Sequence, residues 1–177
     1  LKMMGLLSDM DSPPLLDTPG MMTGIWGGPL YMIAEALGVE VEETREVYRR
    51  WGATEAVDFK YGRVEIGQCA AHRIELQGVV DGEPRIFIDH LHRLYPEAAP
   101  DWPRPQLDVV HANRIEILGT PTIIQETIMQ DPFTGDHNGG GCLATGMRAF
   151  NAIPALCSAE PGILSTLELP LIAGRGG

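Results

Sequence analysis

Two histidines separated by a single residue are the most chemically suggestive pair in the sequence. His90 and His92 form an H-x-H pair within the apolar segment "PRIFIDHLHRL". On a β-strand this spacing places both imidazoles on one face, about 7 Å apart. Such a pair fits three roles: zinc ligands, contacts to a ligand in a pocket, or structural groups at the end of a core whose ring nitrogens are hydrogen-bonded.

The rest of the sequence argues against zinc at this pair. No third ligand is evident, and neither H-E-x-x-H nor C-x-x-C occurs. The structural role and the pocket role both stay open on the residues alone. We therefore expect no metal, and we keep His90 and His92 as candidate substrate-binding residues.

A run of three glycines, Gly139 to Gly141, comes directly before a helix-like segment, where a phosphate-binding loop would be expected. The specific fingerprints are missing, because no G-x-G-x-x-G follows a strand and no G-x-x-x-x-G-K-[ST] occurs. The only lysines, Lys2 and Lys60, are far away in the sequence. The run predicts a flexible lead into a helix and not a nucleotide cradle.

The sequence also lacks a self-sufficient nucleophile. No G-x-S-x-G occurs, which argues against a serine hydrolase. Cys142 falls at a helix start with no identifiable base, and Cys157 falls on an apolar stripe that we expect to be buried. Together with Cys69 they make three cysteines in no metal-like spacing, which favours reduced thiols and a cytoplasmic protein.

Helices and loops are expected in the first part of the chain. Prolines and glycines cluster in residues 8–29 and predict an ordered loop. The apolar spacing then predicts a helix over 29–37, with Leu30, Ile33, Ala34 and Leu37 on one face, and Gly38 terminates it. A second helix is predicted over 42–51, since its acids come first and its arginines last, as the helix dipole favours.

The middle of the chain predicts a β-hairpin over residues 68–94 with Asp81 and Gly82 at its tip. A strict two-residue loop would set Leu76 opposite Phe87 and Ile74 opposite Asp89, residues of the other face. A three-residue loop over 81–83 instead pairs Leu76 with Ile88, Ile74 with His90, and His72 with His92. Because a slip of one residue turns every side chain to the other face, we expect the second register, with a bulge or an odd-length turn near Gly82.

Two further elements are expected after a proline-rich loop over residues 95–106. A second hairpin joins "NRIEILG" to "TIIQETIMQ" through residues 119–121. A C-terminal helix then carries an apolar stripe that should face the core, and a proline that should kink or restart the helix near Asn151. The stripe comprises Leu143, Met147, Phe150, Pro154 and Cys157.

Composition sets the class of protein. The chain has 177 residues, 44% of them hydrophobic, which suits one domain with a sizeable core. Its net charge of −11 argues against binding to nucleic acid or to an anionic membrane, and no apolar run is long enough to span a bilayer. The predicted fold class is α+β, with helices on one face of an antiparallel sheet of four or more strands.

The C-terminal segment carries a family resemblance. The stretch "TGMRAFNAIPALCSAEPGILSTLELPLIAGRG" resembles the end of dihydrodipicolinate reductase-like proteins, and more closely that of the 2,4-diaminopentanoate dehydrogenase and native amine dehydrogenase family. Other blocks agree in order, among them "SDMDSPPLL", "PLYMIAEALGVEVEETREVY", "GVVDGEPRIFIDHLHRL" and "RIEILGTPTI". The resemblance spans almost the whole chain.

The resemblance implies an enzyme with two halves, of which residues 1–177 are the second. The family's N-terminal Rossmann domain binds NAD(P)H, and its C-terminal α+β domain supplies the substrate pocket and subunit contacts. The implied reaction is reductive amination of a ketone or aldehyde, or the reverse oxidation of an amine. The rival interpretation is a stand-alone, non-enzymatic module that binds a small ligand or dimerises, and on either interpretation this chain by itself is expected to be inactive.

The resemblance also suggests site residues on the C-terminal helix. Thr145 and Asn151 lie off the apolar stripe, Thr145 as a candidate for binding substrate and Asn151 for binding the cofactor's carboxamide. The alternative for Asn151 is that it only caps backbone groups freed by Pro154.

One face of the first hairpin is expected to form a homodimer contact. It mixes charged with apolar side chains, which is too apolar for a surface that meets only solvent. The residues are Arg73, Glu75, Gln77, Arg85, Phe87, Asp89, Leu91 and Arg93.

Overall fold

The computed structural model describes residues 1–174, which divide into two compact units. The first unit spans Leu1–Trp102 and the second begins at Pro103. We describe each unit by itself. The fold is α+β, as the sequence predicts.

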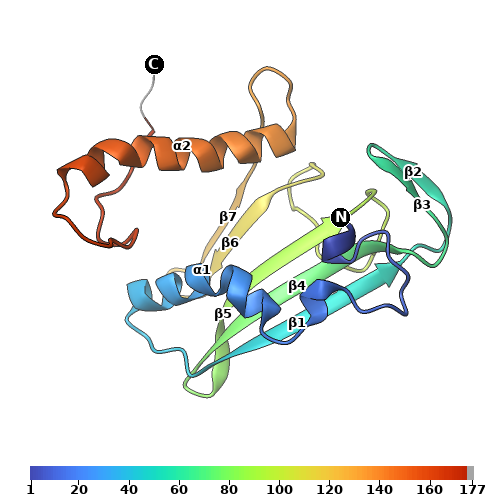
Figure 1. Ribbon diagram of the computed structural model, residues 1–177, viewed down its shortest axis with the longest axis horizontal. Helices are drawn as coiled ribbons and strands as arrows, with labels where there is room; N and C mark the ends of the chain where they lie inside the picture. The colour runs from blue at the N-terminus through green and yellow to red at the C-terminus, as the bar shows by residue number, and fades with distance from the viewer. Residues whose placement is uncertain (175–177) are drawn as a thin grey trace. The chain divides into compact units, whose positions relative to one another are not determined.

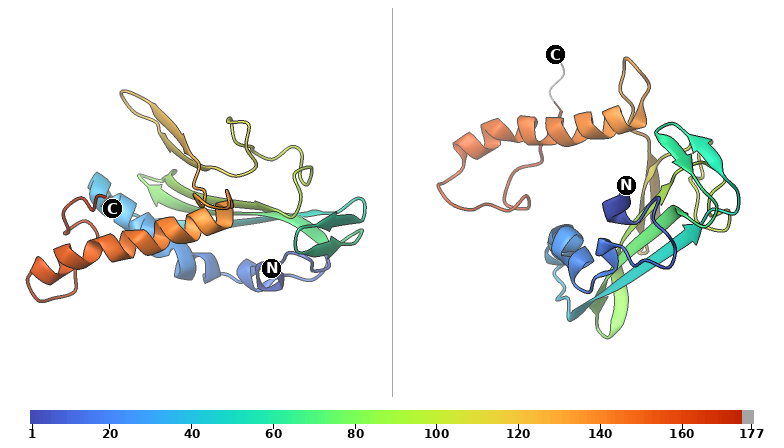
Figure 2. Two further views of the ribbon diagram at one scale, coloured as in Figure 1. Left: turned by 90° about the horizontal axis from the view of Figure 1, so that it is seen from above. Right: turned by 45° about the vertical axis from the view of Figure 1, so that its right-hand side comes forward.

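The first unit is built on a three-stranded antiparallel sheet in the order β1-β4-β5 (Figure 1). The strands are β1 (Glu43–Gly52), β4 (Cys69–Val80) and β5 (Glu83–Arg93), and a small hairpin of β2 (Val57–Phe59) and β3 (Gly62–Val64) extends from one end (Figure 2). The expected four or more strands are therefore divided among sheets. The main sheet has three strands, and the remaining strands of residues 1–174 form two-stranded sheets.

The predicted helix over 42–51 is wrong, because these residues form strand β1. Its register sets Tyr48 opposite Ile74 and Glu46 opposite Leu76, so alternate side chains face the apolar side of β4. Valine, tyrosine, tryptophan and threonine within the segment favour a strand. The order of acids and arginines matches a helix dipole only by coincidence. Pairing with the buried central strand β4 makes the segment a strand.

Helix α1 (Met21–Leu37) begins eight residues before the predicted start, so part of the predicted loop is helical. Two short 3₁₀ helices, η1 (Lys2–Met4) and η2 (Leu15–Asp17), precede it. Leu30 and Ala34 are buried on the sheet as expected, and Gly38 ends the helix with a left-handed φ of 67°. Two other members of the predicted buried face, Ile33 and Leu37, remain exposed.

The early start of α1 depends on a side chain from another element. The Glu46 carboxylate of β1 accepts hydrogen bonds from the backbone N–H groups of Gly20 (2.9 Å) and Thr23 (2.7 Å), and from the Thr23 hydroxyl (2.6 Å). These are donors that the first turn of a helix leaves unsatisfied. A cap that comes from 23 residues away cannot be found in a local sequence window.

The hairpin register is confirmed: Leu76 pairs with Ile88, Ile74 with His90, and His72 with His92. The expected three-residue loop is wrong. Val80 pairs with Glu83, so the turn holds only Asp81 and Gly82, both at positive φ (53° and 77°), as in a type I′ turn. The register shift comes from a bulge at Gly78/Val79, which confirms the predicted bulge near the tip.

Helix α1 and the N-terminal 3₁₀ turns cover one face of the sheet (Figures 1 and 2). The core between them is a cluster of buried apolar side chains. It consists of Leu16, Met22, Leu30, Ala34, Ile74, Leu76, Val80 and Ile86. The histidine-bearing positions of β4 and β5 lie on this covered face, because they share it with Ile74, Leu76 and Ile88.

The second unit holds the predicted hairpin and helix. Strands β6 (Asn113–Ile117) and β7 (Ile123–Thr127) pair antiparallel, and helix α2 spans His137–Ser158. The helix runs unbroken through Pro154, so it does not restart near Asn151. Among the described residues, no helix is long and apolar enough to cross a bilayer.

The apolar stripe of α2 does not face a core within the described chain. Leu143, Met147 and Phe150 are 45%, 44% and 64% exposed, and Cys157 is exposed as well. The amphipathic spacing correctly predicted a helix, but the predicted burial of its apolar stripe is wrong within residues 1–174. A helix needs a second layer to bury its stripe.

Candidate functional site

A chain of three histidines crosses the covered face of the sheet. Nδ1 of His72 lies 2.8 Å from the carbonyl oxygen of Met4, and Nε2 of His72 lies 2.9 Å from Nδ1 of His92. Nε2 of His92 then lies 2.9 Å from Nε2 of His90. The predicted pair His90 and His92 thus comes together with a third ring, that of His72. The predicted register put His72 on the same face, but His72 was not among the predicted site residues.

The carbonyl at the inner end fixes the tautomers of the neutral rings. A carbonyl oxygen only accepts, so Nδ1 of His72 carries the proton and Nε2 of His72 accepts. His92 must then donate from Nδ1, and its Nε2 accepts from the N–H at Nε2 of His90. Each of the three imidazole rings therefore has a defined proton position, and Nδ1 of His90 is left as an acceptor.

Burial determines the charge state of two of the three rings, His72 and His90. His72 is fully buried, and burial lowers its pKa against the opposing effect of the Met4 carbonyl. Burial also lowers the pKa of His90, against the opposing effect of Asp89. His72 and His90 are therefore neutral at pH 7, as the tautomer pattern above requires.

Two aromatic rings pack beside the histidines. Tyr48 of β1 lies with its ring centroid 5.9 Å from that of His72, and its hydroxyl donates to the Met4 carbonyl at 2.7 Å. Trp26 of α1 lies 6.0 Å from His90, centroid to centroid. His72, at the inner end of the row of histidines, is thus enclosed, while His90 at the outer end is only half-buried.

The histidines form no metal site. Within residues 1–174, no group of three or more histidine, cysteine, aspartate or glutamate side chains is arranged to hold a metal ion. The three rings direct their nitrogens at one another through hydrogen bonds.

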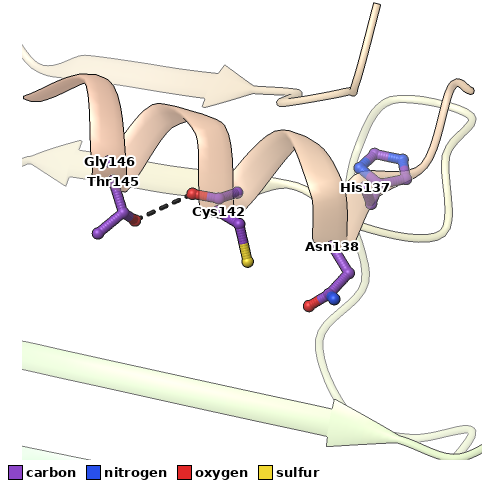
Figure 3. A pocket seen from close by; sticks show the side chains of 6 residues that line it. His137, Asn138, Cys142, Thr145 and Gly146 are labelled. Carbon is purple, nitrogen blue, oxygen red and sulfur yellow. Dashed lines mark hydrogen bonds between the residues drawn. The ribbon is translucent and has the colours of Figure 1, made fainter. Parts of the chain in front are cut away.

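Thr145 lines a shallow hollow on one side of helix α2 (Figure 3). Its hydroxyl donates to the carbonyl oxygen of Gly141, one turn back, at 2.9 Å. The other lining residues come from the same helix: His137, Asn138, Gly141, Cys142 and Gly146. The hollow is open, and its polar groups are those of the first three turns of α2.

Asn151 lies six residues after Thr145, which places the two side chains about 120° apart around the helix axis. They do not share a face. Asn151 is half-buried, and its amide makes no hydrogen bond with any part of the chain that the structure describes. The alternative role, capping backbone groups beside Pro154, has no such hydrogen bond to support it.

The glycine run serves close packing. Gly139 to Gly141 lie within the first turns of α2 and not in a loop ahead of it. Gly140 is buried, and a Cβ at this position would overlap the backbone of Gln130. The helix N-terminus is already capped by Asp136, whose carboxylate accepts from the N–H of Gly139 at 2.8 Å. A carboxylate at that end repels phosphate, so the site is not a nucleotide cradle.

The comparisons with known proteins agree on one family. The family model for the 2,4-diaminopentanoate dehydrogenase C-terminal domain matches residues 22–175. An amine dehydrogenase of Streptomyces virginiae is 39% identical over 171 residues, which cover 96% of this chain and 47% of that relative. The chain therefore spans about half the length of this relative.

A solved structure matches the fold. The structure of an amine dehydrogenase from Mycobacterium smegmatis superposes with a TM-score of 0.58 at 17% identity, covering 90% of this chain and 41% of that one.

The chain folds as an α+β domain, and this fold matches part of a solved amine dehydrogenase structure. The chain belongs to the 2,4-diaminopentanoate dehydrogenase C-terminal domain family, and the resemblance seen in the sequence is confirmed.

Proposed function

We propose that this chain is the substrate-side and oligomerisation domain of an NAD(P)-dependent oxidoreductase that acts on C–N bonds. The observation that carries the proposal is the 39% identity to an amine dehydrogenase across 96% of the chain. The relative is about twice as long, which leaves room for a separate nucleotide-binding domain. The substrate class would be a primary amine, or a ketone or aldehyde with ammonia.

Within this proposal, His90, His92 and Thr145 are candidate substrate-binding residues, and Asn151 is a candidate cofactor-binding residue. The half-buried amide of Asn151 supports its role, because its donor and acceptor are free for a ligand among the described residues. The nicotinamide cofactor supplies hydride transfer when it is bound. The protein's part is to bind and orient the substrate and to exchange protons with it.

The proposal predicts that residues 1–177 by themselves do not hold the cofactor. The first turn of α2 is occupied by Asp136, and the sequence has no dinucleotide fingerprint. We expect no saturable binding when NADPH or NADH fluorescence is titrated with the chain. Micromolar binding of either nucleotide would contradict a cofactor site outside this domain.

The rival function is a stand-alone module that binds a small ligand or dimerises without catalysis. The two differ in the reading frame upstream. The enzyme proposal expects about 130 to 150 further codons with a Gly-rich turn between a strand and a helix. The module proposal expects none.

The oligomerisation role rests on the sheet face opposite α1. Phe87 is 52% exposed on this face. Arg73 pairs with Asp89 at 2.7 Å and with Glu75 at 3.1 Å, so each of these charged groups already has a partner of opposite sign before a second subunit covers the face. A partly apolar face whose charges are paired suits a homodimer contact. The three free cysteines support a reducing, cytoplasmic location.

A further inference from the structure

The three histidines are connected in a way that a binding role for His90 and His92 does not require. A substrate contact needs one ring at the surface. The row of hydrogen-bonded histidines nevertheless continues inward through His92 to His72, which is fully buried. Two of the hydrogen bonds that these rings make join one imidazole to another. Imidazole is a side chain that can take a proton on one nitrogen and release one from the other.

We propose that His90, His92 and His72 act as one proton-accepting unit, and that Nδ1 of His90 is the port through which this unit takes a proton from an amine ligand. The claim about the amine rests on the proposed function. The claim about the shared proton rests on the geometry of the three rings alone.

The direction of transfer follows from the tautomers. A proton that binds to Nδ1 of His90 releases the proton on Nε2 of His90 to Nε2 of His92. His92 in turn releases its Nδ1 proton to Nε2 of His72, which is then protonated on both nitrogens. At His90 and at His92, one N–H bond forms and one breaks. No group is oxidised or reduced. The Met4 carbonyl cannot release a proton, so the proton leaves by the same route.

The port is accessible. Nδ1 of His90 has no hydrogen-bond partner among residues 1–174. No buried side-chain nitrogen or oxygen of these residues lacks a partner, so this atom reaches solvent. As an acceptor it suits an N–H donor, and the aromatic ring of Trp26, whose centroid lies 6.0 Å from that of His90, favours a cationic one. The ligand chemistry that fits both is a protonated primary amine, which loses one N–H proton to the ring.

The unit has capacity for one proton. Two imidazolium rings with nitrogens 2.9 Å apart would repel each other strongly. Asp89 of β5 favours a proton on His90, the amino group of Leu1 disfavours one on His72, and Tyr48 of β1 lies against His72 with its own pKa raised by burial.

The test is a pH titration of the chain with ¹⁵N-labelled histidines, observed by nuclear magnetic resonance. Above neutral pH we expect His72 and His92 as Nδ1–H tautomers and His90 as the Nε2–H tautomer. As the pH falls, the Nε2 signals of His92 and His72 should move towards their protonated values with the same midpoint as His90. Movement of the His90 signals alone, or three separate midpoints, would overturn the shared-proton claim.

A variant separates hydrogen bonding from proton transfer. In His92→Gln, the amide can still donate to His72 and accept from His90, but it cannot pass a proton. We expect the variant to remain folded, with His90 titrating and the His72 signals fixed. His111→Gln, in the separate His111–His137 ring pair, is the matched control and should leave all three titrations unchanged. A wild-type response of His72 in His92→Gln would overturn the relay.

The amine claim is tested in the full-length enzyme. His92→Gln should lower kcat for amine oxidation about 100-fold, with KM for the amine unchanged. An unchanged kcat would overturn the role of the unit in the reaction. Absence of amine oxidation in the wild-type enzyme would instead refute the proposed function, while the magnetic resonance result on the three rings would stand.

Discussion

Gly140→Ala is expected to destabilise the second unit by about 3 kcal/mol, although alanine is the better helix former. Gly140 is buried near the start of α2, and a Cβ there would overlap N, Cα and C of Gln130. These are backbone atoms, which cannot rotate away as a flexible side chain would. Urea unfolding followed by far-UV circular dichroism should show the loss as a lower unfolding midpoint.

Two other glycines of the same helix provide matched controls. A Cβ at Gly141 or Gly146 would meet nothing within 4 Å. Gly141→Ala and Gly146→Ala should therefore each stabilise the helix by about 0.5–1 kcal/mol, since they change only the backbone propensity. If Gly140→Ala matched these controls in sign, the close packing of α2 on Gln130 would be refuted.

Glu46→Gln should lower the free energy of unfolding by about 1–2 kcal/mol at pH 7. The substitution replaces a carboxylate that accepts three hydrogen bonds with an amide that has a single acceptor oxygen. Its NH₂ group would face a donor, the N–H of Gly20 or of Thr23. Chemical denaturation of the two proteins gives the difference.

The pH dependence of that difference is a second readout. Partial burial tends to raise the pKa of Glu46, but the bonds from Thr23 and Gly20 hold it below its ordinary value of 4.5. A lowered pKa in the folded state means that the stabilisation is complete above about pH 4.5 and is lost as the pH falls through the folded-state value. The gap between wild type and Glu46→Gln should close in that range.

Glu43→Gln on the same strand is the control for Glu46. Glu43 is exposed, and within residues 1–174 its carboxylate binds only the neighbouring Arg45, so the change should cost less than about 0.5 kcal/mol. Equal effects at the two positions would mean that Glu46 does not cap α1.

The sequence predicted those elements whose pattern is set by local chemistry and by the partner strand. The β4–β5 register followed from the alternation of Ile74, Leu76 and Ile88, and the bulge followed from the mismatch with a two-residue turn. Helix α2 followed from its apolar spacing. The position of the bulge at Gly78/Val79, and not within the turn, was missed because type I′ geometry at Asp81 and Gly82 already closes the hairpin.

The failures have a common physical cause, which is long-range contact. Strand β1 was read as a helix because its charges matched a dipole, while its burial against β4 is invisible in a local window. Helix α1 starts early because Glu46, on strand β1, caps its N-terminus. His72 was placed opposite His92 by the register, yet its hydrogen bond to Met4 spans 68 residues and could not be inferred.

Of the candidate site, the sequence located His90 and His92 and placed them on a covered face, as the structure has them. Thr145 and Asn151 lie on the predicted helix, but on different sides of it. Their roles stay predictions, because both depend on a ligand that comes from outside this chain.

The most direct test of the account is an assay of the protein encoded by the complete reading frame. It should be supplied with primary amines and either NAD⁺ or NADP⁺, and reduced nicotinamide and released ammonia should be measured together. We expect both products in equal amounts, and reversal of the reaction when a ketone, ammonia and the reduced cofactor are supplied. A folded, cofactor-binding protein that turns over no amine in either direction would contradict the assignment to C–N oxidoreduction.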